Sequence, residues 1–299
     1  MYTIFAHINS LGKIFLEFAL PMLVQSSALI VILLLAGLLL QSRVRAVFRY
    51  WLGMLILAQL ILPPSQALRV NLGYLASGRL DYMGGDSSIV GADATDVLQS
   101  TATPAITWQG VVFLVWVAVV IIMGLILLQR AISARRLVKQ AGEANGLMKD
   151  LLVYCCKCMG VRRKVRLKVA PDGTSPAVCG LFRPVILVPR NLAPSLGSRH
   201  LRAILLHELA HIKRGDLWVN LAQTVLQIVY FYNPLLWLAN SVICRVREQA
   251  VDETVVAAMG ERVRQYPEML ADVAKLAFKR PALSLGVIGV VESQNALAE

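Results

Sequence analysis

The sequence predicts a mainly α-helical, polytopic membrane protein with a small β-sheet in its polar part. Hydrophobic residues make up 57% of the 299 residues and charged residues 16%, whereas a soluble domain has ~45–50% and about 25%. The mean hydropathy is +0.62, and the apolar residues gather in runs long enough to cross a bilayer. This composition excludes a disordered or collagen-like chain and argues against a freely soluble one.

Three apolar runs predict the membrane-spanning helices. They cover residues 18–40, 50–62 and 111–128. The second run is short for a span unless residues 44–48 extend it, with their arginines snorkelling to the surface. We therefore predict a transmembrane region over residues 1–129, with an external loop at about 63–109.

The basic residues predict the orientation of these spans. Seven basic residues follow the first and third runs, namely Arg43, Arg45, Arg49, Arg130, Arg135, Arg136 and Lys139. The loop at 63–109 has two arginines and four aspartates. Because cytoplasmic segments carry excess Lys and Arg, the basic sets belong in the cytoplasm and the loop outside. The net charge of +12 has the same explanation, so we expect no direct contact with nucleic acid.

The polar part of the chain predicts a cytoplasmic domain over residues 130–282. Its helical segments are predicted at 131–159, interrupted near Gly142 and Gly146, and at 199–213, capped by Ser198. Its short strands are predicted at 164–169, 177–179 and 184–188. The strand at 164–169 is indicated by alternating apolar and basic residues.

The second of these helices carries a metal-binding pattern. His207, Glu208 and His211 form the sequence H-E-x-x-H. Histidines at i and i+4 share one helical face, so both imidazoles can bind one zinc ion. Glu208 is then placed to accept a proton from an activated water. Two ordinary helix histidines are the alternative, and another divalent metal is not excluded.

A third ligand is expected further along the chain. Catalytic zinc usually has three protein ligands and one open position. Glu248 and Asp252 are spaced i and i+4 on a predicted helix. Glu248 would complete the ligand set, and Asp252 would hold a ligand imidazole through its other N–H. Acidic pairs at this spacing are also typical of a solvated helix face.

The apolar segment between these two motifs predicts a membrane-dipping helical hairpin at about residues 217–243. Pro234 lies in its middle, where proline breaks a helix. Two arms of about 24 Å are too short for a comfortable crossing. A single spanning helix is the alternative, but it would separate Glu248 from His207 by the thickness of the membrane.

Three further features leave alternatives open. The segment 175–184 is either an edge strand that binds a peptide substrate or a structural hairpin. Cys155, Cys156 and Cys158 lack a fourth ligand and C-x-x-C spacing, so we expect no second metal site there. Arg245 or Arg247 is a candidate for stabilising an oxyanion, although each is equally suited to the membrane surface.

Together these motifs resemble those of a known family, the membrane metallopeptidases of bacterial beta-lactam sensor-transducers. This family includes the bla and mec regulator antirepressors. The likeness extends from about residue 110 to the end of the chain, after three spans. It rests on four segments in the same order, at 175–189, His207 to Asp216, 232–237 (Y-N-P-L-L-W) and Arg247 to Asp252.

The resemblance implies a gluzincin-like zinc peptidase domain on the cytoplasmic side of a bacterial cell (inner) membrane. It implies His207, His211 and Glu248 as zinc ligands, Glu208 as the general base and Asp252 in support. Family members continue into a last span and an extracellular sensor, and proteolysis relieves a repressor. We expect residues 283–299 to end before such a span, so the activating signal stays open.

These observations predict a zinc endopeptidase of signal transduction that cleaves itself or a cytoplasmic regulator, such as a transcriptional repressor. Its expected partners are the lipid bilayer and a peptide or protein substrate, and a homodimer is one candidate assembly. The alternatives are a quality-control zinc peptidase and a non-catalytic zinc-domain scaffold. Glu208 argues against the scaffold, because a structural zinc site needs no base. A DNA-binding membrane regulator rests on charge alone.

Overall fold

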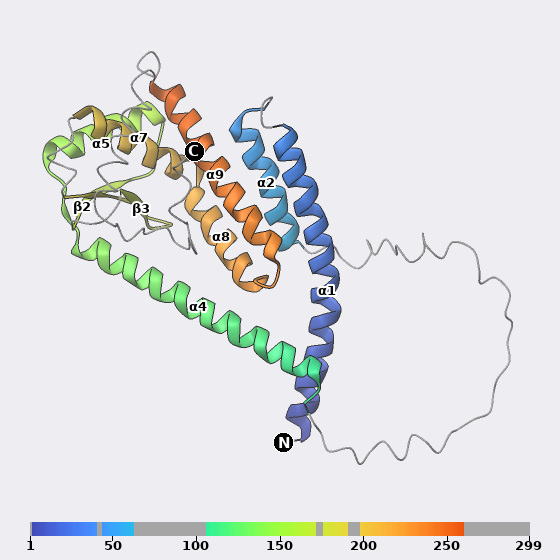
Figure 1. Cartoon of the computed structure of the whole chain (residues 1–299). Helices are drawn as coiled ribbons and strands as arrows, with labels where there is room; N and C mark the ends of the chain where they lie inside the picture. The colour runs from blue at the N-terminus through green and yellow to red at the C-terminus, as the bar shows by residue number, and fades with distance from the viewer. Residues whose placement is uncertain (1, 41–43, 63–105, 172–175, 191–197, 260–299) are drawn as a thin grey trace, which may run out of the picture. The chain divides into compact units, whose positions relative to one another are not determined.

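The computed structural model of the chain describes residues 2–40, 44–62, 106–171, 176–190 and 198–259. It is mainly helical with one small sheet, which confirms the predicted fold class at that level (Figure 1). Most of the predicted external loop and all of the segment 283–299 lie outside the described residues.

The described helices include long apolar ones and shorter ones of the polar part. They are α1 (Tyr2–Leu39), α2 (Ala46–Ile61), α4 (Trp108–Gln140), α5 (Gly146–Met159), α7 (Ser198–Arg214), α8 (Asp216–Val229) and α9 (Pro234–Met259). Helices α1 and α4, of 38 and 33 residues, exceed the ~20 residues that a bilayer core requires. Both are long and apolar enough to span a membrane. Helix α2 has 16 residues, so the three-span topology stays a prediction.

The chain divides into two compact units, and the first comprises residues 1–26 and 58–119. Within it, α1 and α4 pack through aromatic rings. The ring of Phe15 lies 5.8 Å from that of Phe113 and 4.8 Å from that of Trp116. Gly12 allows close backbone approach, because a Cβ there would lie 2.5 Å from the carbonyl oxygen of Gln109.

The second unit, residues 27–57 and 120–299, contains a four-stranded sheet. Its strands are β1 (Gly142–Glu143), β2 (Arg166–Ala170), β3 (Ala177–Cys179) and β4 (Val185–Pro189). Their order is β1-β2-β4-β3. The central pair β2 and β4 is parallel, with Leu167 opposite Ile186. The β3–β4 pair is antiparallel, with Val178 also opposite Ile186, so β3 is an edge strand.

The core of this unit lies between the sheet and the helices. Helices α5 and α7 lie together on one side of the sheet in Figure 1, and α9 packs against α7. Apolar side chains from all three layers are fully buried, among them Ile186, Leu205, Leu206, Leu209 and Val251. The buried face of α7 therefore fixes the side of this helix on which His207 and His211 lie.

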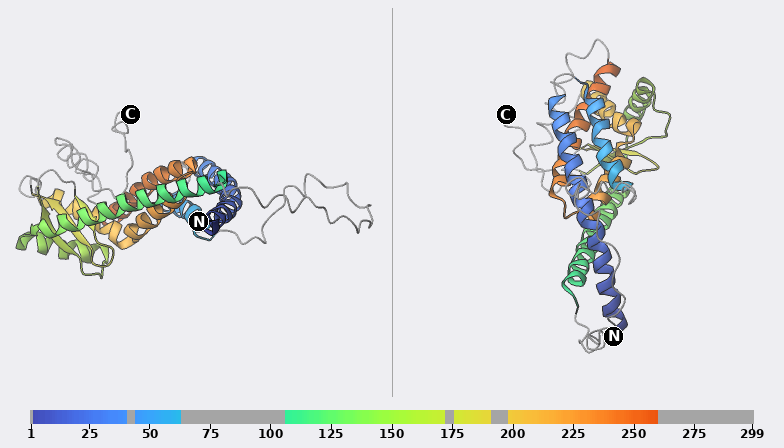
Figure 2. Two further views of the ribbon diagram at one scale, coloured as in Figure 1. Left: turned by 90° about the horizontal axis from the view of Figure 1, so that it is seen from below. Right: turned by 90° about the vertical axis from the view of Figure 1, so that its right-hand side faces the viewer.

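Helices α8 and α9 form an antiparallel pair (Figure 2). The chain turns between them at residues 230–233, where the side chain of Asn233 accepts a hydrogen bond from the Leu235 amide at 3.0 Å. Pro234 occupies the first helical position, which suits proline because no N–H is needed there. Buried amides join the two helices, since Asn240 accepts a hydrogen bond from Gln223 at 3.3 Å and donates one to Gln227 at 3.2 Å.

The return helix α9 has 26 residues and therefore carries Glu248 and Asp252 beyond the turn. Insertion of this hairpin into the bilayer stays a prediction.

Candidate metal centre

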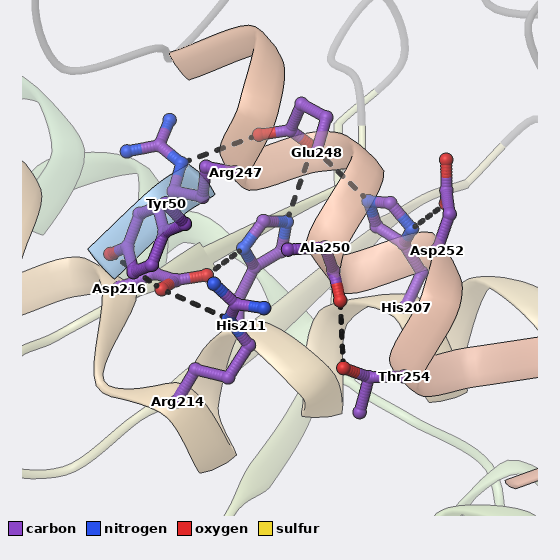
Figure 3. Close-up of polar contacts among 10 residues, drawn as sticks. All are labelled: Tyr50, His207, His211, Arg214, Asp216, Arg247, Glu248, Ala250, Asp252 and Thr254. Atoms are coloured by element: carbon purple, nitrogen blue, oxygen red, sulfur yellow. Dashed lines mark hydrogen bonds and ion pairs between the residues drawn. The ribbon is translucent and has the colours of Figure 1, made fainter. Parts of the chain in front are cut away.

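Two helices bring the three expected ligands together. His207 and His211 lie on α7, one turn apart, and Glu248 lies on α9 (Figure 3). The Nε2 atoms of His207 and His211 lie 3.6 Å and 3.5 Å from the same carboxylate oxygen, Oε2 of Glu248. One possible ligand atom from each of the three residues lies within 4.8 Å of the other two. The packing of α9 on α7 thus joins residues that are 41 positions apart in sequence (248 minus 207).

Each imidazole is also held from its other nitrogen by a carboxylate. The Nδ1 atom of His207 lies 3.4 Å from Oδ1 of Asp252. The Nδ1 atom of His211 lies 2.8 Å from Oδ2 of Asp216. A carboxylate on Nδ1 orients the ring and leaves Nε2 facing the common centre, which is the arrangement that metal-binding histidines usually have.

The carboxylates make the centre favourable for positive charge. Burial lowers the pKa of His207, but hydrogen bonding to Asp252 and Glu248 outweighs it and raises this pKa to about 10. For His211, burial is likewise outweighed by Asp216 and Glu248, which raise its pKa to about 9. Burial raises the pKa of Glu248, yet its hydrogen bonds to the two imidazoles lower it well below the ordinary value. A divalent cation suits the same surroundings and would displace the imidazole protons.

Glu208 lies beside the metal-binding face on α7. Burial raises the pKa of its carboxyl, while the neighbouring imidazoles of His211 and His207 lower it. Burial, together with the nearby carboxylate of Glu208, raises the pKa of the Cys179 thiol to about 11. Because Cys179 belongs to β3, the edge strand of the sheet is near Glu208.

Asp216 and Tyr50 are functional candidates to which the sequence alone assigned no role. The Tyr50 hydroxyl of α2 donates a hydrogen bond to Oδ1 of Asp216 at 3.2 Å, and the Arg214 guanidinium stacks on the Tyr50 ring at 4.6 Å. Gly215 precedes Asp216 with φ +76°, a left-handed conformation that favours glycine. This turn between α7 and α8 brings Asp216 back toward His211. An Asp just after a Gly at a helix end was the available signal.

The two candidate arginines differ in their surroundings. Nε of Arg247 lies 3.4 Å from Oε1 of Glu248, and the side chain is 14% exposed. Arg245 is exposed, on the same helix. Arg247 therefore contacts the ligand set, whereas no contact links Arg245 to it within the described residues.

The donor set fits a divalent metal ion such as zinc. Two imidazole nitrogens and one carboxylate oxygen are the ligands of one class of catalytic zinc site, which keeps another position open. The side chain of Glu248 is 48% exposed, so the centre is accessible to water and substrate. Within the described residues, Cys155, Cys156 and Cys158 form no comparable ligand group, and all five cysteines are free thiols.

The fold and the site thus define a membrane-associated protein with the ligand pattern of a metallopeptidase. Comparison with known sequences agrees: the family described as BlaR1 peptidase M56 matches residues 17–296. The chain belongs to this family.

Two relatives indicate the range of similarity. The chain is similar to "Regulatory protein BlaR1" of Bacillus licheniformis, with 24% identity over 279 residues, covering 85% of this chain and 45% of that protein. It is also similar to "Methicillin resistance mecR1 protein" of Staphylococcus aureus, with 22% identity over 187 residues, covering 62% of this chain and 32% of that protein. The chain therefore spans less than half the length of these curated relatives. The family and the two long apolar helices support a membrane protein.

Proposed function

We propose that the chain is a membrane zinc endopeptidase of signal transduction, with its catalytic domain on the cytoplasmic side of a bacterial membrane. One observation carries the proposal. Two imidazoles and a carboxylate from separate helices converge on one centre, with a second carboxyl group, that of Glu208, beside them. Family membership supports the metallopeptidase class.

Each residue of the site has a role in peptide hydrolysis under this proposal. His207, His211 and Glu248 would hold the zinc ion, which supplies Lewis-acid activation of water and of the substrate carbonyl. Glu208 accepts the proton of the attacking water and passes it to the leaving amine. Its raised pKa suits both steps, because a general acid–base group works best near the operating pH. Asp216 and Asp252 keep the imidazoles oriented.

The edge strand β3 offers a place for the substrate backbone. Its partner β4 occupies only one of its two edges, and Cys179 of β3 is near Glu208. A peptide can add to such an edge through main-chain hydrogen bonds. The proposed substrate is therefore an extended segment of the chain itself or of a cytoplasmic regulator, in keeping with the regulatory names of its relatives.

The proposal is tested by cleavage of casein and of the chain itself, with the purified full chain in detergent. Wild type is expected to cleave and to lose activity with a zinc chelator. Glu208→Gln should retain the metal and lower the rate ~10²–10⁴-fold, because the proton-transfer group is gone. The matched control Glu143→Gln changes an exposed carboxyl of β1 and should cleave normally. A Glu208→Gln chain as active as wild type would contradict the proposed mechanism, and a zinc-loaded wild type that cuts neither substrate would contradict the activity.

A further inference from the structure

A basic aromatic pocket of about 910 Å³ lies at one end of the sheet, and none of the proposed metal ligands lines it. We use this name for the surface formed by Arg163, Lys164, Arg166, Phe182, Arg183 and Trp218. Two backbone segments are held together there, because the Arg166 amide donates a hydrogen bond to the carbonyl oxygen of Pro184 at 3.1 Å. The residues before β2 and the turn between β3 and β4 thus present their side chains side by side.

Four cations gather in this pocket with no compensating carboxylate among its lining residues. Arg163, Lys164, Arg166 and Arg183 are all exposed. No ion pair joins any of them to an acidic residue in the part of the chain that the structure describes. Since like charges repel, a cluster of this kind favours an anionic partner. Arginine is suited to phosphate in particular, because its guanidinium binds oxygen pairs in a fork.

Two aromatic side chains show which anionic partner fits. The ring of Phe182 meets that of Trp218 edge to face, with centroids 5.1 Å apart. Phe182 is 81% exposed at the tip of the β3–β4 turn, and Trp218 is 41% exposed in the first turn of the apolar helix α8. Aromatic side chains beside basic ones are typical of the level where a protein meets lipid headgroups.

We propose that the basic aromatic pocket binds the phosphate headgroups of anionic phospholipids and so seats the end of the sheet on the membrane surface. This inference rests on the proposed function as a membrane protein and on the predicted insertion of the α8–α9 hairpin into the bilayer. Trp218 begins that hairpin, so the pocket would lie at headgroup level, with Phe182 entering the acyl boundary. An acidic peptide shares the charge requirement, but it gives no reason for Phe182 to be exposed beside α8.

The test is binding of phosphatidylglycerol and of phosphatidylcholine to the full chain in neutral detergent, measured by native mass spectrometry. The variant R163Q/K164Q/R183Q should bind phosphatidylglycerol on the order of a hundredfold more weakly, because each cation contributes about fivefold at a membrane surface. The control K157Q/R190Q/R199Q removes three exposed charges that do not line the pocket, and should change binding far less. Phe182→Ser, at an already exposed position, should weaken binding roughly tenfold for both lipids, since it removes one apolar anchor.

Parallel titrations with inorganic phosphate and with hexaglutamate distinguish the ligand source. The proposal requires that phosphatidylglycerol bind more tightly than phosphatidylcholine and than phosphate alone, and that only the pocket variant lose the preference for phosphatidylglycerol over phosphatidylcholine. Equal losses of phosphatidylglycerol binding in the pocket variant and in the control would overturn the proposal. It would also be overturned if the pocket variant lost binding of hexaglutamate but kept binding of phosphatidylglycerol. Zinc content is measured on the same samples. A chain without zinc that still shows pocket-dependent lipid binding would count against the proposed activity and not against the pocket.

Discussion

The candidate centre depends on histidines whose two ring nitrogens have different partners. Nε2 of His207 and of His211 faces Glu248, while Nδ1 faces Asp252 or Asp216. The sequence could nominate His207, His211, Glu248 and Asp252, because H-E-x-x-H and the i, i+4 spacing of Glu248 and Asp252 are local patterns. Their roles as metal ligands and as a supporting residue stay predictions. The sequence assigned no role to Asp216, because its contact with His211 depends on the turn at Gly215 and on packing against α2.

Replacing Asp216 by Asn should weaken metal binding. Asn has nearly the same size, but it lacks the negative charge that orients His211 and increases its basicity. Loss of such a partner typically costs 10–100-fold in metal affinity. Competition with a fluorescent zinc chelator measures the effect, with Asp150→Asn, an exposed acid of α5, as the matched control. Equal affinities in Asp216→Asn and wild type would show that the Asp216–His211 contact is not part of the centre.

The thiols of α5 should differ sharply in reactivity. Cys155 is fully buried, and burial raises its pKa to about 12, whereas Cys158 on the same helix is exposed. Because the thiolate is the reactive form, iodoacetamide at pH 8.5 should modify Cys158 and spare Cys155 until the chain is unfolded. Because the thiol of Cys155 ionises near pH 9 in the unfolded chain and near pH 12 in the folded chain, its contribution to folding stability is complete below pH 9 and is lost as the pH rises toward 12. Peptide mass spectrometry measures the labelling, and equal labelling of both thiols in the folded chain would contradict the buried core.

Among the elements, the strands β2, β3 and β4 were predicted within one or two residues, but β1 and the order of the sheet were not. Alternation and turn residues are local, so 164–169, 177–179 and 184–188 could be recognised as strands. The parallel pairing of β2 with β4, and the edge position of β3, result from tertiary packing. A helix carrying Glu248 and Asp252 was predicted, but not that it continues the second arm of the hairpin as one element, α9, which packs against α7.

The turn between β3 and β4 should require glycine at position 180. Gly180 has φ +93°, and a Cβ there would lie 2.6 Å from the carbonyl oxygen of Arg183. Gly180→Ala should therefore destabilise the fold by about 1–3 kcal/mol, the usual range for a residue forced into such a conformation. Gly146→Ala is the control, because a Cβ there meets nothing within 4 Å and alanine favours a helix. Thermal unfolding in detergent compares the two, and an equal midpoint for both variants would contradict this turn geometry.

At the scale of the whole molecule, the centre joins segments that are distant in sequence. Helix α7 carries His207, helix α9 carries Glu248, and α2 reaches the same place through Tyr50 and through the Ala46 amide, which donates to Glu253 at 3.0 Å. The sequence identified α2 only as a short candidate span. Its contact with the centre could not be predicted, because no local pattern reports which helices pack together. The arrangement connects an apolar helix directly to a proposed metal ligand through the hydrogen-bonded series Tyr50, Asp216 and His211 (Figure 3).

The most direct test of this account is the zinc content of the purified full chain, compared between wild type, Glu208→Gln and Glu248→Ala. Wild type and Glu208→Gln should each hold about one zinc ion per chain, because all three proposed ligands remain. Glu248→Ala should lose the metal, since the carboxylate that meets both imidazoles is removed. Zinc bound by Glu248→Ala as tightly as by wild type would contradict the third ligand and the convergence of α7 and α9 on one metal centre.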